Sequence, residues 1–468
     1  MGIHLKRSRS AAWALPVAVA VVFAVLYGVT AQRGVSWQDS GEFQYRVLVG
    51  DYVWNSGIAR AHPSYIALAR GFSAAFPAAA RLYAVSAFSG VGMALALALV
   101  ASVVRRLTGS PWAAAVAACA LGLSHMGWWM ATCAEVYTWS LAALALELYC
   151  LARYCERGGL RWVIALFGAN GFHAGIHNFA FVGLPVYLAV AWLAVRRGGR
   201  GRAAAWLAGA GCAWLAGAGP LVAQVGAHLL AGCGVVETAR SLLFGVGYER
   251  VVLGVGKPHG PTVAANIALA GVSLLNPCWL YLSGGWRGGA GRVAFRRALA
   301  GLTALHAVFW IRYFVPDQAT FALPTLALLA VWAGLGCGAS LAGGRAAVAR
   351  ALAVLVLGAI CSVAVPQALC AACGRAGLAV KRSRGLPFRD EARFWLKPWK
   401  HDERSAAAFV GAVAGALRPG DALVADSTAA GALLAARAAG ALPQAIRLVT
   451  PWSGETDDEL RALVGDAS

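Results

Sequence analysis

Residues 11–51, AAWALPVAVAVVFAVLYGVTAQRGVSWQDSGEFQYRVLVGD, join a long apolar segment directly to a short acidic one. The apolar part covers 21 residues and follows three basic residues, which is typical of a membrane helix entered from the cytoplasm. A cleaved signal peptide has an apolar core of only about 7 to 15 residues, so the length favours an anchor that stays in place. Asp39, Glu42 and Asp51 then fall in the first loop beyond the membrane.

The composition of the whole chain is too apolar for a soluble domain of this length. Of its 468 residues, 60% are hydrophobic and 13% are charged, and the mean hydropathy is +0.65. Such values predict a polytopic membrane protein. A net charge of +20 is compatible with nucleic-acid binding, but the Lys and Arg residues fall in short clusters between apolar spans. Because that pattern belongs to membrane topology, we expect the lipid bilayer and not nucleic acid as a partner.

The apolar segments predict the fold class, an all-α polytopic membrane protein. A helix needs about 20 apolar residues to cross the membrane, and eleven segments meet this requirement. They are residues 11–31, 80–104, 111–130, 134–154, 160–176, 178–195, 203–230, 261–283, 296–312, 319–341 and 346–369.

The charged residues predict the orientation of these spans. With the N-terminus in the cytoplasm, eighteen Lys and Arg residues lie on the cytoplasmic side and nine on the outer side up to residue 372. Seven of the nine acids in the same part of the chain then face outward. Membrane insertion selects much less on acids than on Lys and Arg. The gathering of carboxylates on the outer face therefore indicates that they have a function there.

The composition changes near residue 372, which predicts two domains. Residues 1–372 form the membrane domain, whose first outer loop is 32–79, and residues 373–468 form a small extracytoplasmic α/β domain. The tail holds eleven of the twenty acids. Its stretch 381–404 is basic and aromatic, and is expected either to lie on lipid headgroups or to form a solvated linker. The predicted elements of the tail are a strand at 422–426, a helix at 427–439 and a strand at 446–449.

The first outer loop permits two interpretations of its acids. Asp39 followed three residues later by Glu42 resembles a capping box, which would simply begin a short helix at the membrane surface. That role does not require Arg60 and His62 further along the loop. Carboxylates held at a membrane face also suit general-base chemistry on a hydroxyl group.

Several motifs, in this order along residues 12–341, resemble a known family. That family is a multi-spanning one long catalogued as a domain of unknown function, and it includes a protein O-mannosyltransferase of the secretory pathway. It belongs to the GT-C glycosyltransferases, membrane enzymes that use a polyprenyl-phosphate-linked sugar. The motifs are Asp39-Ser40-Gly41-Glu42-Phe43, His62-Pro63, Ala134-Glu135-Val136-Tyr137, Gly171 to Asn178, and Asp317 followed by Phe321 and Leu323-Pro324.

The resemblance implies an enzyme with a GT-C-like fold and gives the first outer loop a chemical role. Asp39 would be the general base that deprotonates an acceptor hydroxyl, with polyprenyl phosphate leaving from the opposite face of the sugar and inversion as the outcome. Glu42 would orient the acceptor or hold a cation. The co-substrate would be a polyprenyl-phosphate sugar, and the acceptor a protein or glycan. No nucleotide or redox cofactor is needed, and a divalent cation is left open.

Positive side chains on the predicted outer side are candidates for the departing phosphate, on which charge develops in the transition state. Arg60, His62 and Arg312 lie there, and Arg makes the better phosphate fork. The alternative for each is snorkelling to lipid headgroups. Arg312 and Asp317 share one short loop, which favours a substrate site or a structural ion pair.

Further candidates for substrate binding lie where predicted spans begin and end. An acid at the membrane margin is costly, so Glu135 is expected to be functional, whereas Tyr137 either contacts substrate or anchors its helix at the interface. His173 and His177 are spaced four residues apart on one predicted helical face, beside Asn178. No third ligand follows as in HExxH, so we expect packing or contact with sugar hydroxyls, and no metal site.

Two other classes of function remain open at this point. A transporter or flippase of lipid-linked sugars would show paired halves with broken helices at corresponding positions. The sequence has no clear internal repeat of that kind, and its acids crowd one face. A non-catalytic assembly factor would instead use the C-terminal domain as its binding module.

Overall fold

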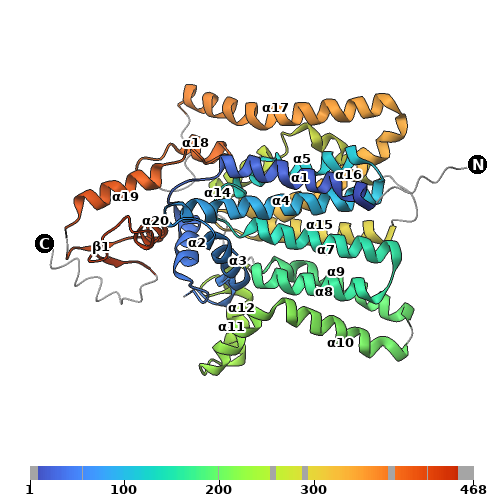
Figure 1. Ribbon diagram of the computed structural model, residues 1–468, viewed down its shortest axis with the longest axis horizontal. Coiled ribbons are helices and arrows are strands. Elements are labelled where there is room, and N and C mark those ends of the chain that lie inside the picture. The colour runs from blue at the N-terminus through green and yellow to red at the C-terminus, as the bar shows by residue number, and fades with distance from the viewer. Residues whose placement is uncertain are drawn as a thin grey trace, which may run out of the picture.

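The structure is a computed structural model that describes residues 9–54, 56–198, 200–252, 260–286, 293–377, 385–418 and 420–451. Long helices lie side by side in a bundle, and short helices and a small sheet gather at one end of it (Figure 1). We call this end the α2 end, after the helix α2 (Gln38–Val49). The bundle is formed by α1 (Arg9–Thr30), α4 (Arg81–Thr108), α5 (Pro111–Gly122), α6 (His125–Met130), α7 (Tyr137–Arg157), α8 (Leu160–Ile176), α9 (Phe179–Gly198), α10 (Arg200–Gly217), α14 (Gly260–Val272), η3 (Pro277–Trp286), α15 (Val293–Arg312), α16 (Leu323–Ser340) and α17 (Arg345–Arg375).

Five helices of the described chain are long and apolar enough to cross a membrane, namely α1, α4, α9, α16 and α17. Two bent pairs of helices bring the number to seven if each pair is one span. The other long helices of the bundle, such as α7 and α8, lie beside them (Figure 1). The eleven predicted crossings therefore stay a prediction.

Three of the predicted spans are wrong as single helices. The span 111–130 is broken between α5 and α6, because Ser124 caps α6 by accepting a hydrogen bond from the backbone of Gly127. The span 203–230 bends by 80° between α10 and α11 (Gly219–Leu230), and the span 261–283 bends by 92° between α14 and η3. Both second halves begin near a proline, which has no backbone N–H to continue the preceding helix.

Close packing of the bundle depends on small residues that let helix backbones approach. In α16, a Cβ added to Gly336 would lie 1.9 Å from the backbone oxygen of Tyr281 in η3. In α8, a Cβ on Gly171 would lie 2.1 Å from the backbone oxygen of Trp214 in α10. Substitution of either glycine would therefore force two helices apart.

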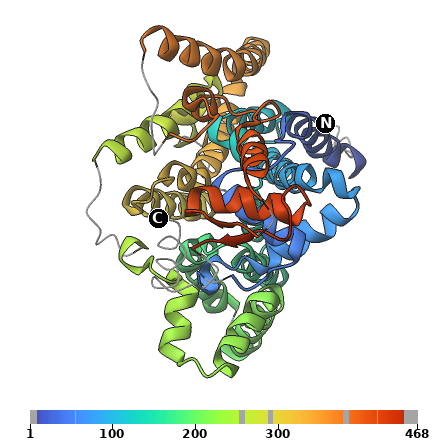
Figure 2. The ribbon, with the colours of Figure 1, turned by 90° about the vertical axis from the view of Figure 1, so that its left-hand side faces the viewer.

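The α2 end contains the short elements of the chain. Its strands β1 and β2 pair in parallel, with Leu423 opposite Leu448, and α20 connects them, so the structure contains the predicted strand, helix and strand. Figure 2 looks onto this end and shows the red C-terminal elements lying across the blue N-terminal ones. The short elements at this end are η1 (Ile58–Arg60), α3 (Pro63–Ala74), η2 (Ala78–Ala80), α12 (Val235–Phe244), α13 (Glu249–Val252), η5 (Gln318–Ala322), α18 (Glu391–Leu396), α19 (Ser405–Ala416), β1 (Ala422–Val424), α20 (Ser427–Ala438) and β2 (Arg447–Val449). The short element η6 (Leu341–Gly343) instead joins α16 to α17.

The described part of the basic and aromatic stretch, residues 385–404, packs against the bundle. The ring of Trp395 lies 5.2 Å from that of Trp129 in α6, and the backbone N–H of Lys400 donates to the oxygen of Thr30 at 2.9 Å. The expectation of a solvated linker is therefore wrong for these residues, and contact with lipid headgroups stays a prediction. Residues 381–384 of the predicted stretch lie outside the described part of the chain. Trp395 is buried in the main hydrophobic core, so the stretch joins the C-terminal elements firmly to α1 and α6.

Candidate active site

Helix α2 carries Asp39 and Glu42 in different environments. Its N-cap is Trp37, which makes no side-chain capping bond, so the capping-box interpretation is wrong. The side chain of Asp39 is 56% exposed, whereas that of Glu42 is 2% exposed. Gln38, the first helical residue, has φ of +54°, a left-handed conformation that costs about 1–3 kcal/mol in a residue with a side chain. The acids thus project from a strained helix start.

Two arginines hold the buried carboxylate of Glu42. Its Oε1 lies 3.3 Å from Nη1 of Arg46, and its Oε2 lies 3.3 Å from Nη2 of Arg60. The same Nη2 atom of Arg60 lies 3.7 Å from Oδ1 of Asp39. Arg46 is fully buried and also donates to the backbone oxygens of Arg60 and Ala61, which fixes the η1 segment that bears Arg60. Arg60 therefore bridges both acids from a rigid support.

Burial decides the charge state of Glu42. Desolvation, and then the neighbouring Asp39, raises the pKa of Glu42 to about 7, while Arg60 and Arg46 lower it by less. A carboxyl group that titrates near neutral pH can exchange protons under the conditions in which an enzyme works. The exposed Asp39 beside it has access to solvent and to any bound molecule.

Glu135 joins this pair from the loop that precedes α7. The hydroxyl of Ser40 donates to Oε1 of Glu135 at 2.7 Å. The backbone N–H of Glu135 donates to the hydroxyl oxygen of Ser89 at 2.9 Å, and the Ser89 hydroxyl donates to the backbone oxygen of Glu135 at 3.0 Å. Burial raises the pKa of Glu135 well above its usual value, and the charges of Asp39 and Asp317 raise it further. Two motifs about 95 residues apart thus meet through one hydrogen bond.

His62 and His177 lie together beneath the acids. Their rings are stacked, with centroids 5.3 Å apart and an interplanar angle of 13°. His62 has φ of +49°, and its Nδ1 lies 2.7 Å from the backbone oxygen of Ile176, so Nδ1 carries a proton there. Burial, and then Arg46, lowers the pKa of His62 to about 3. His62 is therefore neutral near pH 7 and brings no positive charge to a phosphate.

Aromatic side chains from α7 and from the segment between α15 and α16 pack next to His177. Tyr137 begins α7, and its ring lies 5.5 Å from His177 and 5.6 Å from Phe321. Tyr313 lies 4.5 Å from Phe321. Asp317 is half-buried and accepts a hydrogen bond from the Thr320 hydroxyl at 3.5 Å. This wall places apolar ring faces beside the carboxylates.

Comparison with known proteins identifies the fold. Neither a protein-family model nor a curated protein sequence matches the chain. The crystal structure of ArnT from Cupriavidus metallidurans bound to undecaprenyl phosphate is similar to it, with a TM-score of 0.59 and 14% identity over 98% of this chain and 95% of that chain. The fold is GT-C-like. The expected fold class, an all-α membrane protein with several spans, is thereby confirmed.

A second structure of the GT-C kind is longer than this chain. The crystal structure of the Archaeoglobus fulgidus oligosaccharyltransferase in complex with Zn and sulfate has a TM-score of 0.50 and 12% identity. The match covers 94% of this chain but 62% of the archaeal one, so this chain spans less than two thirds of that protein. At such low identities the likeness concerns the fold, and the residues of this GT-C-like chain must be judged from their own geometry.

Within the GT-C-like bundle, His173 is hydrogen-bonded to Glu147 and Ser140 rather than to the acids of α2. Nδ1 of His173 lies 2.9 Å from Oε1 of Glu147, and its Nε2 lies 2.6 Å from the hydroxyl of Ser140. The Tyr187 hydroxyl donates to Oε2 of Glu147 at 2.7 Å. The order Ser, His and Glu is that of a hydrolase triad, but these three side chains are about 1% exposed, so no substrate reaches them. Their hydrogen bonds hold α7, α8 and α9 together.

The expectation that His173 and His177 share one helical face is wrong. Helix α8 ends at Ile176, and His177 has the extended dihedrals φ −158° and ψ 146°. His177 therefore turns toward His62 instead of following His173. Asn178 donates its amide to the backbone oxygen of Leu242 at 3.0 Å and so holds α12 in place. Arg312 is exposed at the end of α15.

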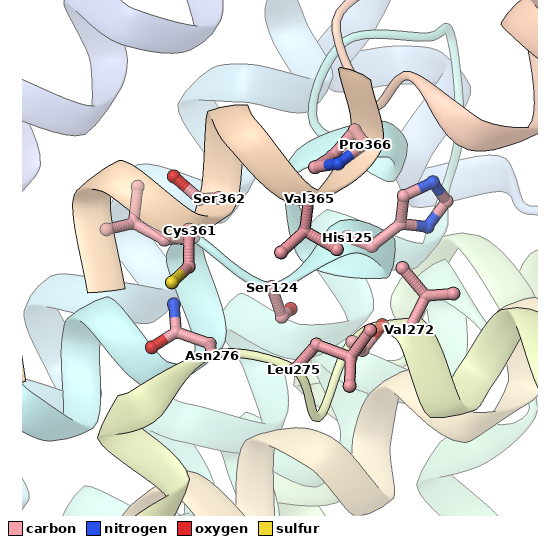
Figure 3. Close-up of a pocket in the computed structure, with 11 residues that line it drawn as sticks. Ser124, His125, Val272, Leu275, Asn276, Cys361, Ser362, Val365 and Pro366 are labelled. Carbon is pink, nitrogen blue, oxygen red and sulfur yellow. The ribbon is translucent and has the colours of Figure 1, made fainter. Parts of the chain in front are cut away.

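The described chain also has a pocket away from these residues. It holds about 270 Å³ of empty space between α17, the start of α6 and the bend before η3, and its lining includes Ser124, His125, Asn276, Ser362 and Pro366 (Figure 3). None of the predicted site residues lines it. Among the described residues, no group of three or more His, Cys, Asp or Glu side chains is placed to hold a metal ion.

Proposed function

We propose that this chain is a membrane glycosyltransferase that moves a sugar from a polyprenyl-phosphate donor to a hydroxyl group of a protein or glycan. The observation that carries the proposal is the arrangement of Asp39, Glu42 and Arg60. An exposed carboxylate lies 3.7 Å from a guanidinium that a buried carboxylate holds in place. A proton acceptor and a phosphate-binding cation are thus adjacent. The GT-C-like fold supports the choice of donor, because ArnT with this fold binds undecaprenyl phosphate.

The proposed reaction is a single displacement. Asp39 takes the proton of the acceptor hydroxyl while the acceptor oxygen forms a bond to the anomeric carbon. The bond between that carbon and the phosphate oxygen breaks, and its electron pair leaves with the polyprenyl phosphate. Attack and departure on opposite faces invert the configuration. The reaction needs no nucleotide or redox cofactor, because a lipid phosphate is already a competent leaving group.

The neighbouring side chains divide the remaining tasks. Arg60 is 24% exposed and neutralises charge on the departing phosphate, for which a guanidinium has the matching fork of donors. Glu42 fixes the direction of Arg60. Glu135, held by Ser40, hydrogen-bonds a sugar or acceptor hydroxyl, and the ring of Tyr137 packs against the sugar. The resemblance to the O-mannosyltransferase family favours a protein hydroxyl as acceptor.

The proposed orientation places the α2 end outside the cytoplasm. The bias of Lys and Arg in the sequence supports a cytoplasmic N-terminus. The C-terminal elements and the loop with Asp39 lie at the same end of the bundle, so both are extracytoplasmic in this orientation (Figure 1). A lipid-linked donor on that leaflet would reach Asp39 from the membrane.

The test is sugar transfer by purified protein in vesicles, supplied with a panel of polyprenyl-phosphate sugars and acceptor peptides or glycans. We expect transfer by the parent chain and a loss of about two orders of magnitude or more in Asp39→Asn, the usual scale for a missing general base. Glu237→Gln removes an exposed acid of α12 and is the matched control, with turnover unchanged. A chelator added to the parent tests for a divalent cation.

Two results would contradict the proposal. Equal turnover by Asp39→Asn and the parent would exclude Asp39 as the base. Movement of labelled donor across the vesicle membrane, with no transfer to any acceptor, would instead indicate a flippase of lipid-linked sugars.

A further inference from the structure

Two glycines bring the C-terminal helix α20 against α2, the helix that carries Asp39. A Cβ added to Gly431 of α20 would lie 2.4 Å from the backbone oxygen of Gln38 and 2.8 Å from the backbone nitrogen of Glu42. A Cβ added to Gly41 would lie 2.7 Å from the carbonyl carbon of Gly431 and 2.8 Å from the nitrogen of Ala432. The two backbones are therefore in direct contact, and the contact leaves no room for a methyl group.

A second contact holds the residue just before α2. The indole Nε1 of Trp37 donates to the hydroxyl of Ser405 at 2.8 Å, and its ring lies 5.1 Å from Phe409 of α19. Val35 and Trp37 are buried in a separate hydrophobic cluster whose other members come from the C-terminal elements. The buried apolar contacts of the start of α2 are thus mainly with the C-terminal elements, although Leu82 of α4 packs against the same cluster.

The first turn of α2 needs such support. Its N-cap makes no side-chain hydrogen bond, and its first residue, Gln38, has the left-handed φ of +54°. A helix start without a cap and with a strained residue depends on contacts from other elements, here the hydrogen bond from Ser40 to Glu135 and the packing of α20. Gly431 packs on the backbone of that turn, at Gln38 and Glu42, on either side of Asp39.

We propose that Gly431 is a positioning residue, and that α20 holds the first turn of α2 so that Asp39 and Glu42 face Arg60. The C-terminal elements then act on the reaction without touching substrate. The effect on turnover rests on the proposed function, whereas the effect on the structure of α2 does not.

The test compares Gly431→Ala with Gly411→Ala in the full chain. Both glycines lie inside helices, so each change adds one methyl group and raises helix propensity equally. Only Gly431 meets another backbone, because a Cβ at Gly411 has no atom within 4 Å. Hydrogen exchange of peptides that cover residues 36–46 reports on α2, and transfer assays give kcat and the KM for the donor.

For Gly431→Ala we expect amide exchange in residues 36–46 about tenfold faster than in the parent. We expect kcat lower by about tenfold to a hundredfold, because small displacements of catalytic groups have effects of this size. The KM for the donor should change by less than kcat, since Arg46, which holds the backbone of Arg60, lies near the other end of α2 from the Gly431 contact. Gly411→Ala should leave all three measurements unchanged.

Each outcome decides the inference. Parent-like exchange of residues 36–46 in Gly431→Ala overturns it. Faster exchange without transfer by any protein, the parent included, leaves the positioning contact valid and refutes the proposed function. If Gly431→Ala does not fold, Ser405→Ala removes the hydrogen bond to Trp37 without adding volume. It should then give faster exchange of residues 36–46, and unchanged exchange there overturns the inference as well.

Discussion

Replacing Glu42 by Gln is expected to remove a pH dependence of folding stability. Glu42 is 2% exposed and sits 3.3 Å from both Arg46 and Arg60. Burial outweighs these two cations and raises the pKa of Glu42 from 4.5 to about 7. Compared with the unfolded chain, the folded protein therefore favours the neutral form of Glu42, and a Gln side chain imitates that neutral form in shape and charge.

The size of the effect follows from the displacement of the pKa. One pKa unit corresponds to 1.36 kcal/mol, so a rise from 4.5 to about 7 corresponds to about 3 kcal/mol. Because the pKa of Glu42 is higher in the folded protein than in the unfolded chain, protonation of Glu42 favours folding. Its contribution to the free energy of unfolding is fully present below pH 4.5, where the unfolded chain is also protonated, and is lost as pH rises through about 7. The parent is thus destabilised at high pH, and Glu42→Gln is not.

Thermal unfolding of both proteins in one detergent, from pH 5 to pH 8, measures this difference. Other titrating groups are shared, so the gap in Tm between Glu42→Gln and the parent isolates Glu42. We expect the gap to widen in favour of Glu42→Gln by a few degrees as pH rises. A constant gap, or one that widens in favour of the parent, would show that Arg46 and Arg60 dominate over burial.

Two further changes probe the surroundings of Asp39. Ser40→Ala removes a hydrogen bond that lowers the pKa of Glu135, so the acid side of the pH profile for transfer should move up by as much as about one unit. An unchanged pH profile would show that the protonation of Glu135 does not control transfer. Arg60→Lys keeps the charge but loses the guanidinium, whose Nη2 atom lies near both Asp39 and Glu42 and whose fork of donors suits a phosphate, so turnover should fall about tenfold or more. Full activity of the lysine variant in the same assay would mean that charge alone suffices.

The sequence was sufficient to predict that the blocks with Asp39 and Glu135 lie on the same side of the membrane, but not how they meet. The blocks with Asp39 and Glu135 are both polar and lie at the ends of apolar segments, which predicts their convergence at one membrane face. The structure joins them through Ser40. Arg46 lies four residues after Glu42 on α2, a spacing that places the two side chains on one helical face. That spacing was the signal by which Arg46 could have been found.

Breaks within apolar segments could not be predicted from hydropathy. A window average sums the apolar character of α10 and α11 without regard to the 80° bend between them. For α8 the predicted end at residue 176 is confirmed, but the extended backbone of His177, which takes it off the face of His173, was not predicted. Where a helix ends depends on tertiary contacts, such as the stacking of His177 on His62, which local patterns do not contain.

The motif Asp39-Ser40-Gly41-Glu42 illustrates why four successive residues need not share one purpose. Each of its residues meets a different neighbour: Asp39 faces solvent and Arg60, and Ser40 reaches the loop before α7. Gly41 admits the backbone of α20, and Glu42 is held between two arginines. Successive residues of a helix point in directions about 100° apart, so four of them can contact four separate elements. Substitutions along the motif should therefore have different effects. A change at Asp39 should affect proton transfer, a change at Ser40 should shift the pKa of Glu135, and a change at Gly41 should disturb the packing of α20 on α2.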